Sequence, residues 1–164
     1  MNGVRQATRH DVPQMVALIE AKRRQYQIYN PEFWSKAANS AELSVPYFTK
    51  MVTEPSWCVL CAMDGPEMLG FISAREVPVP PVYDAVRACL VDDFTVRDGD
   101  EWQRAGRMLL DRFKDEARAR DWRQVVVICG NLDEAKAAML RDAGLILNTN
   151  WWTVRLPATS DRVP

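Results

Sequence analysis

The stretch that most constrains how this chain folds is 90–121, which has the pattern of a β-strand, a polar loop and an amphipathic helix. Residues 90–96 are mostly apolar or β-branched, and they stop at the turn-forming run Asp-Gly-Asp at 98–100. One apolar helix face follows, formed by Ala105, Leu109, Phe113 and Ala117. Because backbone N–H groups point out of the first turn of a helix, the loop is a candidate phosphate site.

Length and composition favour one ordinary globular domain. The chain has 164 residues, of which 48% are hydrophobic, so we expect a single domain over 1–164, with 157–164 as a frayed tail. The net charge of −1 does not favour nucleic acid or an anionic membrane as a partner. The sequence has no apolar run of membrane-spanning length and no signal-peptide pattern at its start, so we expect a cytoplasmic protein.

The cysteines and the single histidine leave little basis for a metal site. Cys58 and Cys61 have the spacing of half a zinc site, but on a strand these positions face opposite ways and no second Cys or His pair follows. We therefore expect buried free thiols and no metal. His10 is the only histidine, which disfavours a histidine-based catalytic triad.

The remaining patterns predict an α/β order with one mixed sheet, β-α-α-β-β-β-α-β-α-β. Strands are predicted at 4–8, 57–63, 68–75, 90–96, 124–130, 145–147 and 151–156. Helices are predicted after Asp11 and over 44–54, 101–121 and 131–143. The proline-rich run 77–83 is predicted to be an ordered loop.

The stretch 90–121 resembles the central motif of the GNAT superfamily, the acetyl-CoA-dependent N-acetyltransferases. In a gap-free alignment Val96 falls on the family's strand-end Val, Gly106 on the second Gly of the phosphate loop, and residues 109–110 on the following apolar pair. The element order agrees with the family over 4–156. The resemblance implies a mostly antiparallel sheet with a splayed central parallel pair and helices on both faces.

The same resemblance implies that acetyl-CoA, or CoA, is the co-substrate. The pantetheine arm is expected to bond the backbone of Phe94, Thr95 and Val96 in the splay of the sheet. The expected contacts to the phosphates come from Arg104, Ala105, Gly106 and Arg107, and Asn131 is a further expected contact to the cofactor. Glu101 and Arg104 depart from the family pattern, and the alternative for the two arginines is a solvated helix surface.

An acceptor site is implied by the resemblance of 90–96 to the diamine (spermidine/spermine) acetyltransferases. Asp92 falls on their acceptor-facing acid, which implies that it binds or deprotonates a small primary amine. Strand alternation predicts that Asp92 and Asp93 face opposite sides. The alternative for Asp92 is a structural ion pair. Aromatic walls of the acceptor pocket are expected from Tyr26, Tyr29 and Trp34.

One departure concerns the proton donor to the leaving thiolate. The family tyrosine that protonates it falls on Leu140, so water or Tyr83 would have to act instead. On the resemblance as a whole, the chain is expected to be an N-acetyltransferase. The missing tyrosine favours the alternative, a catalytically degenerate domain that binds CoA or acts through dimerisation. A homodimer is expected because adjacent tryptophans, Trp151 and Trp152, cannot share one core face of a strand.

Overall fold

The computed structural model describes residues 3–84 and 86–156, so the tail predicted over 157–164 lies outside the described residues. Its centre is one five-stranded sheet in the order β1-β2-β3-β4-β5. The strands are β1 (Gly3–Gln6), β2 (Trp57–Asp64), β3 (Glu67–Val77), β4 (Ala88–Val96) and β5 (Gln124–Val127). Pairing is antiparallel except between β4 and β5, which confirms the predicted mixed sheet with one parallel pair. This pair lies at one end of the sheet rather than at its centre, because the strands predicted beyond it do not form.

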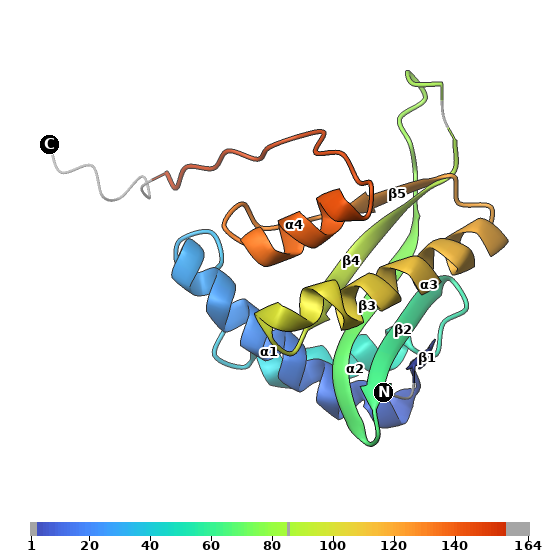
Figure 1. Cartoon of the computed structure of the whole chain (residues 1–164). Coiled ribbons are helices and arrows are strands. Elements are labelled where there is room, and N and C mark those ends of the chain that lie inside the picture. The colour runs from blue at the N-terminus through green and yellow to red at the C-terminus, as the bar shows by residue number, and fades with distance from the viewer. Residues whose placement is uncertain (1–2, 85, 157–164) are drawn as a thin grey trace, which may run out of the picture.

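Helices cover both faces of this sheet (Figure 1). They are α1 (Val12–Tyr29), α2 (Ser40–Met51), α3 (Ala105–Ala119) and α4 (Glu134–Asp142), with short 3-10 turns η1 (Arg9–Asp11) and η2 (Gly99–Gln103). The predicted apolar face of α3 packs with α4 and one face of the sheet around Leu109 and Phe113. The opposite face packs with α1 and α2 around Met15 and Phe48. Within the described ranges, no helix is long and apolar enough to cross a membrane.

The prediction of free thiols is confirmed, and all of the cysteines except Cys129, which is half-buried, are buried. All four thiols are free, and Cys58 and Cys61 are both buried in β2. Cys58 belongs to the cluster under α3, whereas Cys61 belongs to the cluster under α1 and α2, so the two side chains lie on opposite faces of the sheet. Burial raises the pKa of each of these thiols to about 11. They are packing residues rather than half of a metal site.

A β-bulge interrupts β4 where the two aspartates lie. Ala74 of β3 pairs with Val91 and Ser73 pairs with Asp93, so Asp92 is an extra residue without a partner on β3. Val91 and Phe94 both belong to the cluster under α3, although three positions separate them. Regular alternation would have put them on opposite faces. The prediction that Asp92 and Asp93 face opposite sides is therefore wrong, because the bulge turns both side chains toward α1 and α2.

The strands predicted at 145–147 and 151–156 are not formed. Residues 145–156 have no regular secondary structure, and beyond α4 the chain runs outward from the sheet (Figure 1). Trp151 and Trp152 are 72% and 92% exposed, so their rings contribute nothing to the core. Over the residues that the structure describes, β5 is consequently the last strand of the sheet on this side.

Acid should destabilise the fold through Glu20 of α1. Burial pushes the pKa of Glu20 upward, but hydrogen bonds from Ser40, Arg23 and Lys36 outweigh it and lower the pKa to about 2. A carboxylate with a depressed pKa stabilises the fold above its unfolded pKa and loses that contribution as pH falls through the folded value. We expect the urea midpoint to fall between about pH 4.5 and pH 2. Glu20→Gln should flatten this decline, and Glu42→Gln, an exposed change on α2, should leave it intact.

Candidate active site

A cavity of about 330 Å³ opens where α1, the end of β4, η2 and the start of α4 come together. This volume is within the usual range for a small-molecule site, roughly 300–1,000 Å³. Thr95 and Val96, two of the predicted cofactor contacts, line it, and so does Tyr29. The other lining residues are Ala21, Lys22, Gln25, Arg97, Asp98, Gly99, Trp102, Leu132, Asp133, Glu134 and Ala135. The structure thus brings part of the predicted donor and acceptor sets to one cavity.

Two lysines occupy the point at which β4 and β5 separate. Strand pairing ends at Val91 and Val127. Beyond it, Nζ of Lys136 donates to the carbonyl oxygens of Phe94 and Ile128, at 3.2 and 2.9 Å, and so bridges the two strands. Nζ of Lys22 donates to the same Phe94 oxygen at 2.7 Å. A carbonyl oxygen has two lone pairs, so Phe94 offers none to a ligand until one lysine moves.

The lysine pair has unusual electrostatics. Lys136 is 1% exposed, and burial, together with the nearby charge of Lys22, lowers the pKa of its amine well below the usual range. Burial also lowers the pKa of Lys22, against the opposing charge of Asp93. In the described part of the chain, neither amine has a carboxylate within ion-pair distance. Two amines that share one acceptor at a site where one of them is fully enclosed do not both hold a proton easily.

Sequence reasoning missed both lysines, although one signal was present. Lys136 precedes Met139 and Leu140 by three and four positions, so it lies on the buried face of α4. The preceding residue, Ala135, is exposed and lies off that face. Lysine on a helix is usually solvated, and the spacing alone therefore did not distinguish this residue.

The predicted aromatic group forms a cluster beside the lysines, in which Tyr26 is buried and Tyr29 and Trp34 are half-buried. Tyr26 donates its hydroxyl proton to Oδ2 of Asp133 at 2.9 Å and accepts from the backbone N–H of Gly130 at 3.1 Å. Burial raises the pKa of Tyr26, and the Asp133 charge adds to the shift. The rings of Tyr29 and Trp34 lie 5.6 and 5.1 Å from that of Tyr26. Of these three rings, only Tyr29 lines the cavity.

The two aspartates of the bulge precede Thr95 on β4, and neither of them lines the cavity. Asp92 is exposed and accepts a hydrogen bond from Tyr47 of α2 at 2.5 Å. Burial raises the pKa of Asp93 to about 6, with the Asp92 charge adding and the Lys22 charge opposing. A carboxyl group with this pKa can accept a proton near neutral pH. The bulge therefore presents an exposed acid and a less exposed, more basic one on the same face.

At the loop predicted to bind phosphate, groups of the protein itself already contact the residues that are expected to bind the phosphate. Gly106 lies under the ring of Trp102, where an added Cβ would come within 2.7 Å of a ring carbon. Arg104 pairs with Glu101, and Arg107 pairs with Asp111 and bonds the Asp142 carbonyl. A phosphate would have to compete for both guanidinium groups.

The remaining predicted residues lie apart from the cavity. Asn131 is exposed just after β5, and it does not line the cavity that includes Leu132. Tyr83 is 67% exposed on the loop between β3 and β4, which extends away from α1 and α4 in Figure 1. Ala105 is fully buried at the start of α3. The structure does not bring Tyr83 or Asn131 together with the aspartates of the bulge.

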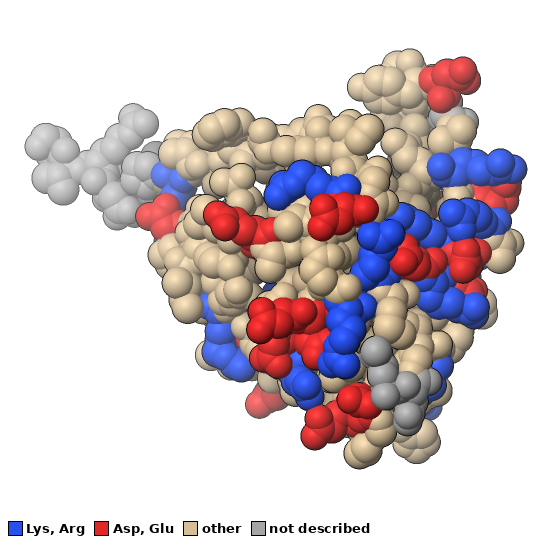
Figure 2. Space-filling model, in the orientation of Figure 1, with Lys and Arg blue, Asp and Glu red and all other residues tan. Residues whose placement is uncertain are grey.

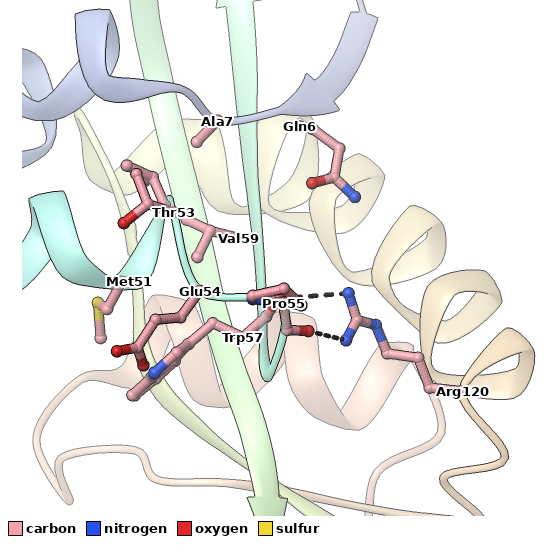
Figure 3. A pocket seen from close by; sticks show the side chains of 10 residues that line it. Gln6, Ala7, Met51, Thr53, Glu54, Pro55, Trp57, Val59 and Arg120 are labelled. Carbon is pink, nitrogen blue, oxygen red and sulfur yellow. Dashed lines mark hydrogen bonds between the residues drawn. The ribbon is translucent and has the colours of Figure 1, made fainter.

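A second hollow of about 150 Å³ lies between the end of α2, the start of β2 and the end of α3. Figure 3 shows Arg120 reaching across it, where its guanidinium donates to the carbonyl oxygens of Pro55 and Trp57 at 2.9 and 3.3 Å. The guanidinium of Arg120, the charged donor at this hollow, is thus already bonded to the backbone. We therefore interpret the contact as structural, since it holds the end of α3 against the segment that enters β2.

Charges on the face that α3 presents are mixed rather than of one sign, as Figure 2 shows. Ion pairs along that helix join Arg107 to Asp111, Arg112 to Glu116 and Arg118 to Asp115. The visible face therefore has no single-sign field of the kind that attracts a polyanion.

Comparison with solved structures identifies the fold. A variant of the BH1408 protein from Bacillus halodurans superposes with a TM-score of 0.81 at 14% identity, over 94% of this chain and 99% of that one. The ribosomal-protein-alanine N-acetyltransferase of Brucella melitensis gives 0.62 at 17% identity, over 93% and 99%. An aminoglycoside acetyltransferase from a soil metagenome, in complex with sisomicin, gives 0.64 at 14% identity, over 94% and 95%. No protein-family model and no curated protein sequence matches the chain. The chain therefore has the fold of these acetyltransferases.

Proposed function

We propose that this protein is an N-acetyltransferase of the GNAT type, which transfers an acetyl group from acetyl-CoA to a small primary amine. The observation that carries the proposal is the cavity at the end of β4, beside a bulge that turns two carboxylates toward α1 and α2. Donor and acceptor could meet there at the diverging edges of β4 and β5. Fold similarity to named acetyltransferases supports the reaction class but not the acceptor.

On the donor side, the proposal places the pantetheine arm in the cavity against the backbone of Thr95 and Val96. The phosphates would lie near the first turn of α3, where N–H groups point outward. Arg104 and Arg107 lie close to that turn and would exchange their carboxylate partners for phosphate oxygens.

On the acceptor side, the proposal gives the two aspartates separate parts. Asp92, which is exposed, would attract a protonated amine toward the bulge. Asp93, with its raised pKa, would accept the proton that the amine must lose before it attacks the thioester. Tyr47, bonded to Asp92, would orient that carboxylate.

The test uses the full chain, acetyl-CoA and a panel of mono-, di- and polyamines, with released thiol and acetylated amine both measured. We expect stoichiometric formation of the two products for at least one amine, and CoA binding in calorimetry. Gly106→Asp should weaken CoA binding, because it adds a negative charge near the phosphates and collides with Trp102. An unmutated protein that binds no CoA and consumes no acetyl-CoA would refute the proposal.

A second candidate is a domain that binds CoA without transferring an acyl group. Leu140, which falls on the position of the family's proton-donating tyrosine, is an apolar core residue 8% exposed, and the Phe94 carbonyl is taken by the lysines. Binding of CoA in calorimetry without product from any amine would favour this candidate.

We also propose that two copies associate through the segment 145–156. Among the described residues no strand pairs with the outer edge of β5, and Val126 within this strand is 41% exposed. An unpaired edge next to exposed apolar side chains favours pairing with another strand. We expect a dimer in light scattering at micromolar concentration, and Trp151→Ser with Trp152→Ser should shift it toward monomer. A monomeric unmutated protein would contradict this expectation.

A further inference from the structure

The lysine pair at the separation of β4 and β5 has a feature that the proposed reaction has not used. Lys22 comes from α1 and Lys136 from α4, more than a hundred residues apart in the chain, yet both amines donate to the single oxygen of Phe94. Lys136 lies behind, flanked by the rings of Phe94 and Trp102 at 5.4 and 5.5 Å from their centroids. Lys22 lines the cavity. One amine is thus accessible to a ligand and the other is enclosed.

We propose that Lys22 and Lys136 hold one ammonium proton between them, and that Lys22 gives this proton to the thiolate that leaves during acyl transfer. This inference rests on the proposed function and supplies the proton donor that Leu140 cannot be. Lys136 acts as a positioning residue, because its enclosed amine bonds the strands and keeps the shared charge near Lys22.

The step balances as follows. The acceptor nitrogen forms a bond to the thioester carbonyl carbon, and the carbon–sulfur bond breaks with its electron pair on sulfur. The protonated acceptor first loses one proton to Asp93, which releases it to solvent before the attack. As the amide forms, the nitrogen loses its second proton to Asp93, and Lys22 delivers its own proton to the sulfur, so that amide and free thiol are formed. Proton return from Asp93 to the lysine pair, through water, restores the starting state. No oxidant, reductant or metal is needed.

Several charged groups surround the pair and set its proton occupancy. Asp93 faces Lys22 from β4, and Asp133 lies at the start of α4, so both favour the charged amine. The Cys129 thiol lies after β5, and its pKa is raised by burial, so it is un-ionised near neutral pH. Arg23 on α1 interacts with Asp93. Burial opposes all of these favourable charges and is the largest effect on both lysines.

A direct test uses ¹³Cε-labelled lysine in the full chain, which is tractable because the sequence has only five lysines. At pH 7 we expect one of the Lys22 and Lys136 signals to have the shift of a neutral amine. Lys22→Met should move the remaining Lys136 signal toward the charged form, because it removes a neighbouring positive charge. Lys50→Met, at a surface side chain 69% exposed, should change neither signal. Two fully charged amines at pH 7 would overturn the shared proton, whether or not the protein is an enzyme.

The catalytic part is tested by kinetics. Lys22→Met should lower kcat by about 10²-fold, the usual scale of general acid catalysis. Lys22→Arg keeps the charge but cannot release a proton, so it should be equally impaired. Lys136→Met should shift the alkaline limb of the pH–rate profile.

A donor with a better leaving group separates a catalytic from a structural defect. With an aryl thioester, whose thiol is far more acidic, the leaving sulfur needs no proton, and the deficit of Lys22→Met should largely disappear. A defect that is the same for both donors would overturn the assignment of Lys22. If the unmutated protein transfers no acyl group at all, the proposed function fails and the catalytic assignment with it, while the labelled-lysine experiment still decides the shared proton.

Discussion

Gly70→Ala should destabilise this protein by about 3 kcal/mol, near the top of the usual range for overpacking a core. An added Cβ at Gly70, in β3, would lie 2.7 Å from the Thr95 carbonyl oxygen and 3.0 and 3.2 Å from side-chain atoms of Val96 and Leu109. A backbone oxygen cannot rotate away as a side chain can, so β3 and β4 must move apart. The melting temperature should fall by roughly 10 °C.

Gly99→Ala is the matched control for this effect. Nothing lies within 4 Å of a Cβ added there, and Gly99 is not among the glycines with positive φ. The chemical change is the same, but the space differs, so Gly99→Ala should melt close to the unmutated protein. Equal melting temperatures for the two variants would mean that β3 and β4 are not as close at Gly70 as the structure has them.

Asp93→Asn should lower acetyl transfer by about 10²-fold and abolish the acidic limb of its pH–rate profile. The pKa of Asp93 is raised to about 6, so below that pH the carboxyl group is protonated and cannot accept a proton from the amine. In the unmutated protein the rate should therefore fall as pH drops through about 6. Steady-state rates with saturating acetyl-CoA between pH 5 and 9 measure this directly.

Two further variants make the result specific. Asp92→Asn removes the like charge that helps to raise the pKa of Asp93, so the acidic limb should move to lower pH. Asp115→Asn, at a side chain 65% exposed and paired with Arg118 on α3, should leave the limb where it is. An acidic limb that persists unchanged in Asp93→Asn would assign the proton to another group.

The parts of the fold that could be predicted are those in which residue type and spacing act locally. The continuous apolar run at 57–63 and the four-residue repeat of α3 each predict an element that the structure has. Strand 145–147 and strand 151–156 could not be judged in this way. An apolar alternating segment satisfies the strand pattern, but a strand also needs a neighbouring edge, which depends on the path of the chain after α4.

The site was less predictable for a related reason. Thr95 and Val96 line the cavity as expected, because the end of a central strand is fixed by the strand itself. The lysine pair depends on two helices that come together only in the folded chain. No sequence pattern around Lys22 or Lys136 indicates that the two side chains are neighbours. The bulge in β4 is set by the way β3 pairs with β4. The residue types at Asp92 and Asp93 do not by themselves indicate a bulge.

The extra residue in β4 also affects how the chain should be aligned with other sequences. Deleting one residue from a regular strand would turn every later side chain to the opposite face. Deleting Asp92 or Asp93 would instead restore the regular ladder and leave Phe94 and Val96 on the core face they already occupy. At the bulge in β4, a related chain can therefore be one residue shorter and still keep the later side chains of the strand on their present faces. Such a shorter chain would have a single acid in place of Asp92 and Asp93. An alignment without a gap at the bulge could pair that acid with the aspartate that does not occupy the equivalent place in the structure.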